Sequence, residues 1–132
     1  MAAAADGKGR LLAIDDNLDS AELVARIATK CGYEAQSVTD PGEFRRMLAD
    51  WKPDVLSLDL CMPHEDGMSL FSILEDSGFA GQLVIISGQD GWLRKTAARL
   101  AEARGLKVLD DFAKPVDIQA LRKALTGARA DC

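Results

Sequence analysis

The sequence has no long apolar run, and its 132 residues include one histidine, three cysteines and four prolines. No run approaches the roughly 20 apolar residues that a bilayer-spanning helix needs, and the N-terminus lacks the apolar stretch of a signal peptide. Cys31, Cys61 and Cys132 are odd in number and widely spaced, so we expect neither a disulfide framework nor a zinc site. This cysteine usage favours a reducing compartment, the cytoplasm.

Positive charge is also scarce, because 16 lysines and arginines oppose 21 aspartates and glutamates and leave a formal net charge of −5. Proteins that bind nucleic acid or anionic lipid without specificity need a positive surface, so we expect no direct nucleic-acid partner and no membrane partner. The chain is 48% apolar and 28% charged, which is typical of one soluble globular domain. The arrangement of the acidic residues therefore matters more than their number.

Short apolar runs alternate along the chain with longer segments of helical periodicity. The runs do not alternate between polar and apolar residues, which is typical of parallel strands buried on both faces. Five strands are predicted in this way, over residues 11–14, 33–38, 54–58, 83–86 and 106–112. Five helices are predicted between and after them, over residues 21–31, 41–51, 68–76, 92–104 and 117–125.

This alternation predicts an α/β fold, a doubly wound (βα)5 sandwich with a five-stranded parallel sheet and right-handed crossovers. We expect the domain to cover residues 10–125. Residues 1–9 are expected to form a flexible lead-in, and residues 126–132 a tail or the start of a linker. In such sheets ligands bind at the carboxyl ends of the strands, so the residues that follow each apolar run are the candidates for function.

Polar residues follow four of the five predicted strands. Asp15 and Asp16 follow the first, Asp59 the third, Ser87 the fourth and Lys114 the fifth. Three close carboxylates repel one another unless they share a cation, and a small set of oxygen ligands suits Mg²⁺. A carboxylate nucleophile, a hard metal, a hydroxyl and an ammonium together predict a phosphoryl-transfer site.

The chain resembles the receiver domain of two-component response regulators over about residues 10–125. Each motif is weak alone, but four in order at the ends of different predicted strands are specific. The motifs are Asp15-Asp16, Asp59-Leu60-Cys61-Met62-Pro63 with Asp66-Gly67 after it, Ser87-Gly88, and Lys114-Pro115. The resemblance implies a flavodoxin-like strand order of 2-1-3-4-5.

The resemblance also implies a role for each acidic residue. Asp59 would be the phosphoacceptor, taking its phosphoryl group from a sensor histidine kinase or a histidine phosphotransfer protein. Mg²⁺ or Mn²⁺ would be bound by Asp16 directly, by Asp15 mainly through water, by Asp59, and by the backbone carbonyl of Cys61. The domain would be a signalling phosphoacceptor rather than an enzyme, assisting only its own phosphorylation and dephosphorylation.

The remaining residues would stabilise the phosphoryl group and change conformation when it binds. By resemblance, Ser87 and Lys114 each bind a phosphoryl oxygen, Phe112 turns inward as Ser87 moves, and the bond before Pro115 is cis. The fourth helix, fifth strand and fifth helix would form the switched surface, which is also the expected homodimer surface. A downstream effector would respond to this change.

Two features bear on the wider protein and on alternative functions. Lys114 lies 27 positions after Ser87, an interval similar to that of receivers fused to EAL-type cyclic-di-GMP phosphodiesterase domains, and such an effector would follow Cys132. A Mg²⁺-dependent phosphohydrolase with an aspartyl nucleophile is an alternative, although it would need a carboxylate at position 61. A docking module that no longer takes phosphate is a further alternative, which the complete residue set disfavours.

Several of these residues also have simpler interpretations. Core packing is as good an explanation of Phe112 as a switch. Lys114, considered alone, is an exposed lysine before a turn. Trp92 could be an exposed interface anchor, but we expect it to pack. Cys31 is expected to be buried on its helix, and His64 is assigned no role.

Overall fold

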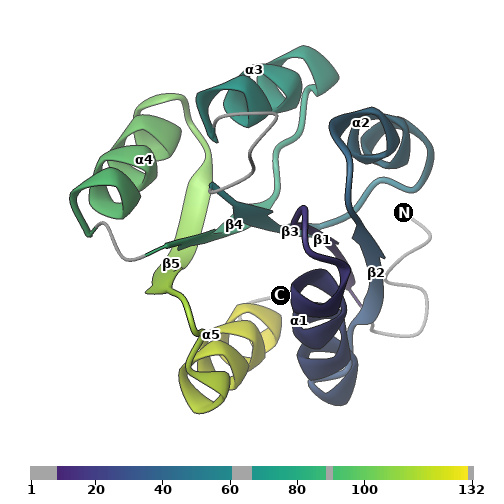
Figure 1. The fold of residues 1–132 in the computed structure, drawn as a ribbon. Coiled ribbons are helices and arrows are strands. Elements are labelled where there is room, and N and C mark those ends of the chain that lie inside the picture. Colours follow the sequence, from purple (N-terminus) through teal and green to yellow (C-terminus); the bar gives the residue numbers. More distant parts are fainter. Residues whose placement is uncertain (1–8, 61–66, 89–90, 131–132) are drawn as a thin grey trace.

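The computed structural model describes residues 9–60, 67–88 and 91–130, over which five strands and five helices alternate (Figure 1). The strands are β1 (Arg10–Ile14), β2 (Glu34–Val38), β3 (Val55–Asp59), β4 (Gln82–Ser87) and β5 (Lys107–Ala113). The helices are α1 (Leu18–Lys30), α2 (Pro41–Asp50), α3 (Gly67–Ser77), α4 (Gly91–Ala103) and α5 (Ile118–Ala130).

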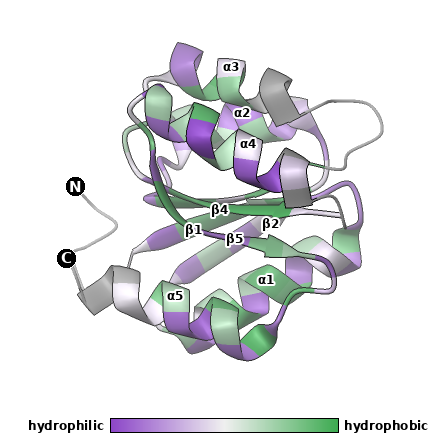
Figure 2. Cartoon of the chain, turned by 90° about the vertical axis from the view of Figure 1, so that its left-hand side faces the viewer, coloured by the Kyte–Doolittle hydropathy of each residue, from purple (hydrophilic) through white to green (hydrophobic). Residues whose placement is uncertain are grey.

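The strands form one parallel sheet in the order β2-β1-β3-β4-β5, which confirms the predicted fold class and strand order. Helices α1 and α5 cover one face, and α2, α3 and α4 cover the other (Figure 1). Apolar residues line both interfaces between the sheet and the helices (Figure 2). Alternate residues of β1 serve the two sides, since Leu12 and Ile14 pack with α2 and α3 while Leu11 and Ala13 pack with α1.

Capping residues close in the sequence explain where α1 and α2 begin, and a glycine follows the end of α1. Asn17 caps α1, because its side chain accepts a hydrogen bond from the Ser20 backbone N–H at 3.0 Å. Asp40 caps α2 in the same way through Glu43 N–H at 3.1 Å, with Pro41 at the first helical position. Gly32, with φ of 94°, follows the end of α1 and adopts a backbone conformation that favours glycine.

Three local expectations differ from the structure. Helix α5 continues to Ala130, past the predicted end at residue 125, because one glycine costs less than the surrounding helix formers gain. The Trp92 side chain is 75% exposed, so the expectation that it packs is wrong. Cys31 follows the last residue of α1 as its C-cap and is half-buried rather than buried.

Within the described residues, none of the helices combines the length and the apolar character that crossing a membrane requires. The longest are 13 residues, as in α1, α4 and α5.

Candidate functional site

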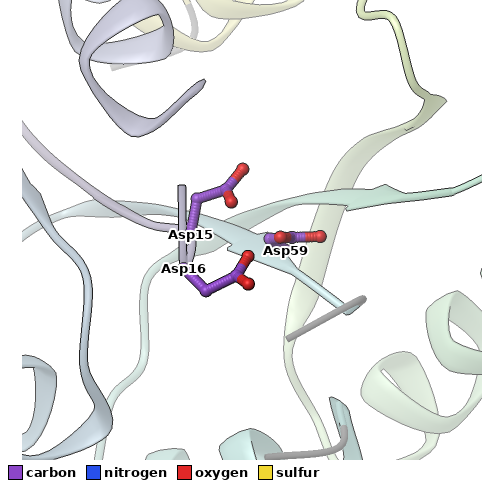
Figure 3. A group of neighbouring side chains, drawn as sticks. All are labelled: Asp15, Asp16 and Asp59. Atoms are coloured by element: carbon purple, nitrogen blue, oxygen red, sulfur yellow. The ribbon is translucent and has the colours of Figure 1, made fainter. Parts of the chain in front are cut away.

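An acidic cluster forms where β1 and β3 end side by side. Ile14, the last residue of β1, pairs with Leu58, so the next residue on each strand brings Asp15 and Asp59 to the same edge of the sheet. Each of Asp15, Asp16 and Asp59 offers a carboxylate oxygen, and these oxygens lie within 4.8 Å of one another (Figure 3). The structure therefore brings together the three acids that the sequence placed at strand ends.

The three carboxylates differ in their exposure to solvent. Asp59 is 1% exposed and Asp15 is 5% exposed, whereas Asp16 is exposed. The Asn17 backbone N–H donates to Asp15 Oδ1 at 2.9 Å, which fixes the orientation of that carboxylate. Asp15 and Asp59 are thus buried acids, and Asp16 forms the solvent side of the cluster.

The Lys114 ammonium bridges the two buried carboxylates. Its Nζ lies 3.0 Å from Asp15 Oδ2 and 3.2 Å from Asp59 Oδ2. The backbone N–H of Lys114 donates to the Ser87 carbonyl at 2.9 Å, which aligns the residues after β5 with the end of β4. The Lys114–Pro115 peptide bond is cis. Position alone suggested an exposed lysine, and the contacts instead make it part of the acidic cluster.

Burial changes the proton affinity of this cluster. Burial, together with the adjacent Asp59 carboxylate, raises the pKa of Asp15 to about 6, although the Asn17 N–H and the Lys114 ammonium oppose the change. Burial lowers the pKa of Lys114, but hydrogen bonds to Asp15 and Asp59 outweigh it and leave the pKa above its ordinary value. The site thus has an excess of negative charge that one lysine does not neutralise, and a divalent cation fits it.

Ser87 contributes a buried hydroxyl to the site. It is the last residue of β4, it is fully buried, and its Oγ has no hydrogen-bond partner among the described residues. Asp59 pairs with Ile86, so Ser87 lies one position beyond Asp59 along the neighbouring strand. An unpaired buried hydroxyl is destabilising, and at this position it is available to an oxygen brought to Asp59.

The other predicted residues lie farther from this cluster or outside the described part. Phe112 pairs with Ile86 and is 8% exposed within the core beneath α1 and α5, so in this structure it packs. Pro115 is exposed. Cys61, whose backbone carbonyl was predicted to bind metal, lies outside the described residues, as does His64.

An apolar cavity that the sequence analysis missed opens next to the acidic cluster. It has a volume of about 610 Å³ and lies between α1 and the segment that follows β5. Its lining includes Asp15, Leu23, Lys114, Val116 and Ile118. Leu23 and Ile118 are 38% and 46% exposed. One feature of the sequence could have indicated this cavity. Leu23 lies outside the buried face of α1, where an apolar residue is not explained by packing against the sheet.

Several proteins of known sequence or structure are similar to this chain. It is 29% identical over 113 residues to the response regulator MprA of Mycobacterium leprae, a match covering 85% of this chain and 47% of that protein. It is 33% identical over 66 residues to the transcriptional regulatory protein GltR of Pseudomonas aeruginosa, covering 50% of this chain and 27% of GltR. The chain spans about half the length of MprA.

The fold is shared with solved structures. A response regulator from Colwellia psychrerythraea superposes with a TM-score of 0.82 at 28% identity, covering 94% of this chain and 98% of that one. The chemotaxis response regulator CheY4 of Vibrio cholerae, at 20% identity, shares the fold with a TM-score of 0.74 over 92% of this chain and 98% of its own. Residues 11–126 match the family described as the response regulator receiver domain. With its fold and its acidic cluster, the chain belongs to the response regulator receiver domains.

Proposed function

We propose that this receiver domain accepts a phosphoryl group on Asp59 and passes on the resulting conformational change. The observation that carries the proposal is the buried Asp59 carboxylate, which lies beside Asp15 and 3.2 Å from the Lys114 ammonium. An Asp59 oxygen attacks the phosphorus of a phosphohistidine, and an O–P bond forms as the P–N bond breaks. The imidazole leaves with the bonding electrons and takes up a proton, and an acyl phosphate remains on Asp59.

We further propose that Asp15, Asp16 and Asp59 hold a divalent cation, Mg²⁺ or Mn²⁺, together with the backbone carbonyl of Cys61. Their hard oxygen donors and their excess negative charge support this choice. Held by these residues, a cation would supply positive charge that offsets the charge on the phosphoryl oxygens. Asp16, being exposed, keeps the cation side of the site accessible to solvent and to the incoming donor.

Lys114 and Ser87 complete the proposed phosphoryl site. The Lys114 ammonium already bridges Asp15 and Asp59, and in our proposal it pairs with a phosphoryl oxygen when Asp59 is modified. The Ser87 hydroxyl, which lacks an acceptor among the described residues, donates to another. Phosphorylation thus gives Ser87 a partner, and the displacement of Ser87 is the proposed origin of the signal, with Phe112 turning inward behind it.

The proposed phosphodonor is a protein, a sensor histidine kinase or a histidine phosphotransfer protein. The cavity beside Lys114, with the exposed Leu23 and Ile118 at its edge, supports a protein donor because it offers apolar contact area next to the acceptor. The effector is proposed to be a separate partner or a further domain, EAL-type or other. Homodimerisation through α4, β5 and α5 and a cytoplasmic location are proposed on the family resemblance.

Labelling with a small phosphodonor such as acetyl phosphate in the presence of Mg²⁺ tests the proposal. The wild-type chain should take up at most one acid-stable, hydroxylamine-sensitive phosphoryl group, and Asp59→Asn should take up none. Asp50→Asn, which removes an exposed acid from α2, is the matched control and should label as the wild type does. Labelling of Asp59→Asn would contradict the assignment of Asp59 as the phosphoacceptor.

Release of inorganic phosphate from a phosphate ester, measured beside the labelling, separates the alternatives. A phosphohydrolase with an aspartyl nucleophile would release many equivalents of phosphate per chain from a phosphate ester, whereas we expect no turnover beyond the chain's own acyl phosphate. A docking module would remain unlabelled in the wild type. The complete set of Asp16, Asp59, Ser87 and Lys114 favours the phosphoacceptor.

A further inference from the structure

Helix α4 is joined to its neighbours by an ion pair near each end. Near its start, Arg94 Nε donates to Asp111 Oδ1 of β5 at 2.8 Å, and Lys95 Nζ lies 3.5 Å from the same oxygen. Just after its end, Arg104 Nη1 lies 3.4 Å from Glu75 Oε1 of α3. The helix is therefore held to β5 at one end and to α3 at the other.

The two ion pairs differ in their shielding from water. The side chains of Arg94 and Asp111 are 18% and 14% exposed, whereas those of Arg104 and Glu75 are 32% and 50% exposed. Exposed pairs contribute little because water and salt screen them, and shielded pairs with short hydrogen bonds are stronger. The Arg94–Asp111 pair is accordingly the firmer of the two attachments.

This pair lies next to the residues of the proposed switch. Asp111 immediately precedes Phe112, and along β4 it pairs with Ile85, two positions before Ser87. On the helix side, α4 begins at Gly91, four positions after Ser87 in the sequence. Arg94 and Asp111 thus connect the two segments that leave the Ser87 region, one through α4 and one through β5.

The pair is formed in a structure in which Ser87 Oγ has no hydrogen-bond partner among the described residues. If Ser87 moves to donate to a phosphoryl group on Asp59, we expect the start of α4, which lies four positions later in the sequence, to shift relative to β5. Because Arg94 is held at 2.8 Å from β5, that motion strains or breaks the ion pair. The pair therefore stabilises the arrangement without phosphoryl more than the arrangement with it.

We propose that the Arg94–Asp111 ion pair is a latch that holds the start of α4 on β5 and so weakens phosphoryl binding at Asp59. This inference rests on the proposed phosphoacceptor function. Arg94 and Asp111 are positioning residues, since neither contacts the acidic cluster in the described contacts. Their effect reaches the site through α4 and the end of β4.

The affinity for beryllofluoride with Mg²⁺, an analogue of the phosphoryl group, measured by titration calorimetry tests the latch. Arg94→Gln and Asp111→Asn should each bind roughly fivefold more tightly than the wild type, which corresponds to a coupling of about 1 kcal/mol. The double variant should bind no more tightly than Asp111→Asn alone, because Asp111→Asn already removes the Arg94 ion pair together with the longer Lys95 contact. Arg94→Lys, which keeps the charge, should stay near the wild type.

Matched controls come from α4 and from the residue just after its end. Arg104→Gln removes the ion pair to α3, and Arg99→Gln removes an exposed cation that has no ion pair in the described part of the chain. Both should bind beryllofluoride as the wild type does. Urea unfolding of every variant provides the second readout, since a merely structural role would lower stability without tightening binding.

Wild-type or weaker affinity in Arg94→Gln and Asp111→Asn would overturn the latch while leaving the phosphoacceptor proposal intact. Equal tightening by Arg104→Gln would also overturn it, because the effect would then belong to helix α4 as a whole. Failure of the wild type itself to bind beryllofluoride would instead overturn the proposed function, and the latch with it.

Discussion

Asp15 has a carboxyl group that folding buries beside a second carboxylate. Its pKa is raised to about 6 because burial disfavours the charged form, and its neighbour Asp59 adds to that effect. In an unfolded chain the same group titrates near 3.8. Between these values the folded state binds more protons than the unfolded state, so this group stabilises the fold less as the pH rises from about 4 to 6.

Asp15→Asn should therefore stabilise the cation-free protein at pH 7, because an amide of the same shape has no charge to bury. We expect a gain of about 1 kcal/mol in the free energy of unfolding. This is less than the whole pKa shift of Asp15 would give, because Lys114 loses one of its partners. The gain should shrink as the pH falls toward 4. Urea unfolding with EDTA at several pH values measures it, with the exposed Asp16→Asn as the control. A constant difference across pH would contradict this account.

Arg10 joins three elements at the amino-terminal edge of the sheet. It begins β1, its Nη1 donates to the Trp51 carbonyl at 2.6 Å, and its Nε lies 3.2 Å from Glu34 Oε1 on β2. The guanidinium carbon also lies 5.4 Å from the centre of the Trp51 ring, within the range of a cation–π contact. One side chain thus ties β1 and β2 to the end of α2.

Arg10→Ala should lower the free energy of unfolding by about 1 to 2 kcal/mol, because it removes a part-buried hydrogen bond and a cation–π contact together. The fluorescence of Trp51 should also shift as its ring loses the guanidinium. Arg45→Ala, which changes an exposed arginine on α2, is the control and should have almost no effect. Equal stability of the two variants would show that these contacts contribute nothing measurable.

Helix α5 contains one residue that favours the helix poorly. Gly127 lies inside α5, and a Cβ built on it would have no neighbour within 4 Å. Gly127→Ala should therefore stabilise the protein by about 0.5 to 1 kcal/mol through helix propensity alone. Thermal unfolding measures the change, and Gly105→Ala, at φ of 85° where a side chain is strained, should destabilise instead. A destabilised Gly127→Ala would mean that α5 ends before residue 127.

The whole molecule should respond to a cation at the acidic edge. A ligand that binds only the folded state raises the free energy of unfolding with its concentration, so millimolar Mg²⁺ should raise the melting temperature and EDTA should reverse this. Asp16→Asn should reduce the rise in melting temperature, because it removes one proposed cation ligand that is exposed and does not contribute to the hydrophobic core. Ca²⁺, which prefers more ligands, should shift it less. Identical melting curves with Mg²⁺ and EDTA would refute a cation site.

Much of the fold could be predicted because the elements have local signals. Unalternating runs such as Leu83 to Ile86 indicate strands buried on both faces, and Asn17 and Asp40 cap helices through hydrogen bonds between near neighbours. The end of α5 and the exposure of Trp92 were predicted wrongly. The end of α5 depends on a small balance of helix propensities around Gly127, whereas the exposure of Trp92 depends on whether distant elements cover it, and the local pattern carries no information about that.

Which polar groups follow the strands can be read along the chain, because the apolar runs end at Asp15, Asp16, Asp59, Ser87 and Lys114. How these groups meet depends on the packing of the strands. The register of β1 on β3 sets Asp15 beside Asp59, and β5 carries Lys114 to both from positions 99 and 55 residues away. Burial arises where separate elements exclude water together, which no stretch of sequence does alone. The raised pKa of Asp15, the shielded Arg94–Asp111 pair and the Ser87 hydroxyl, which has no partner among the described residues, all follow from it.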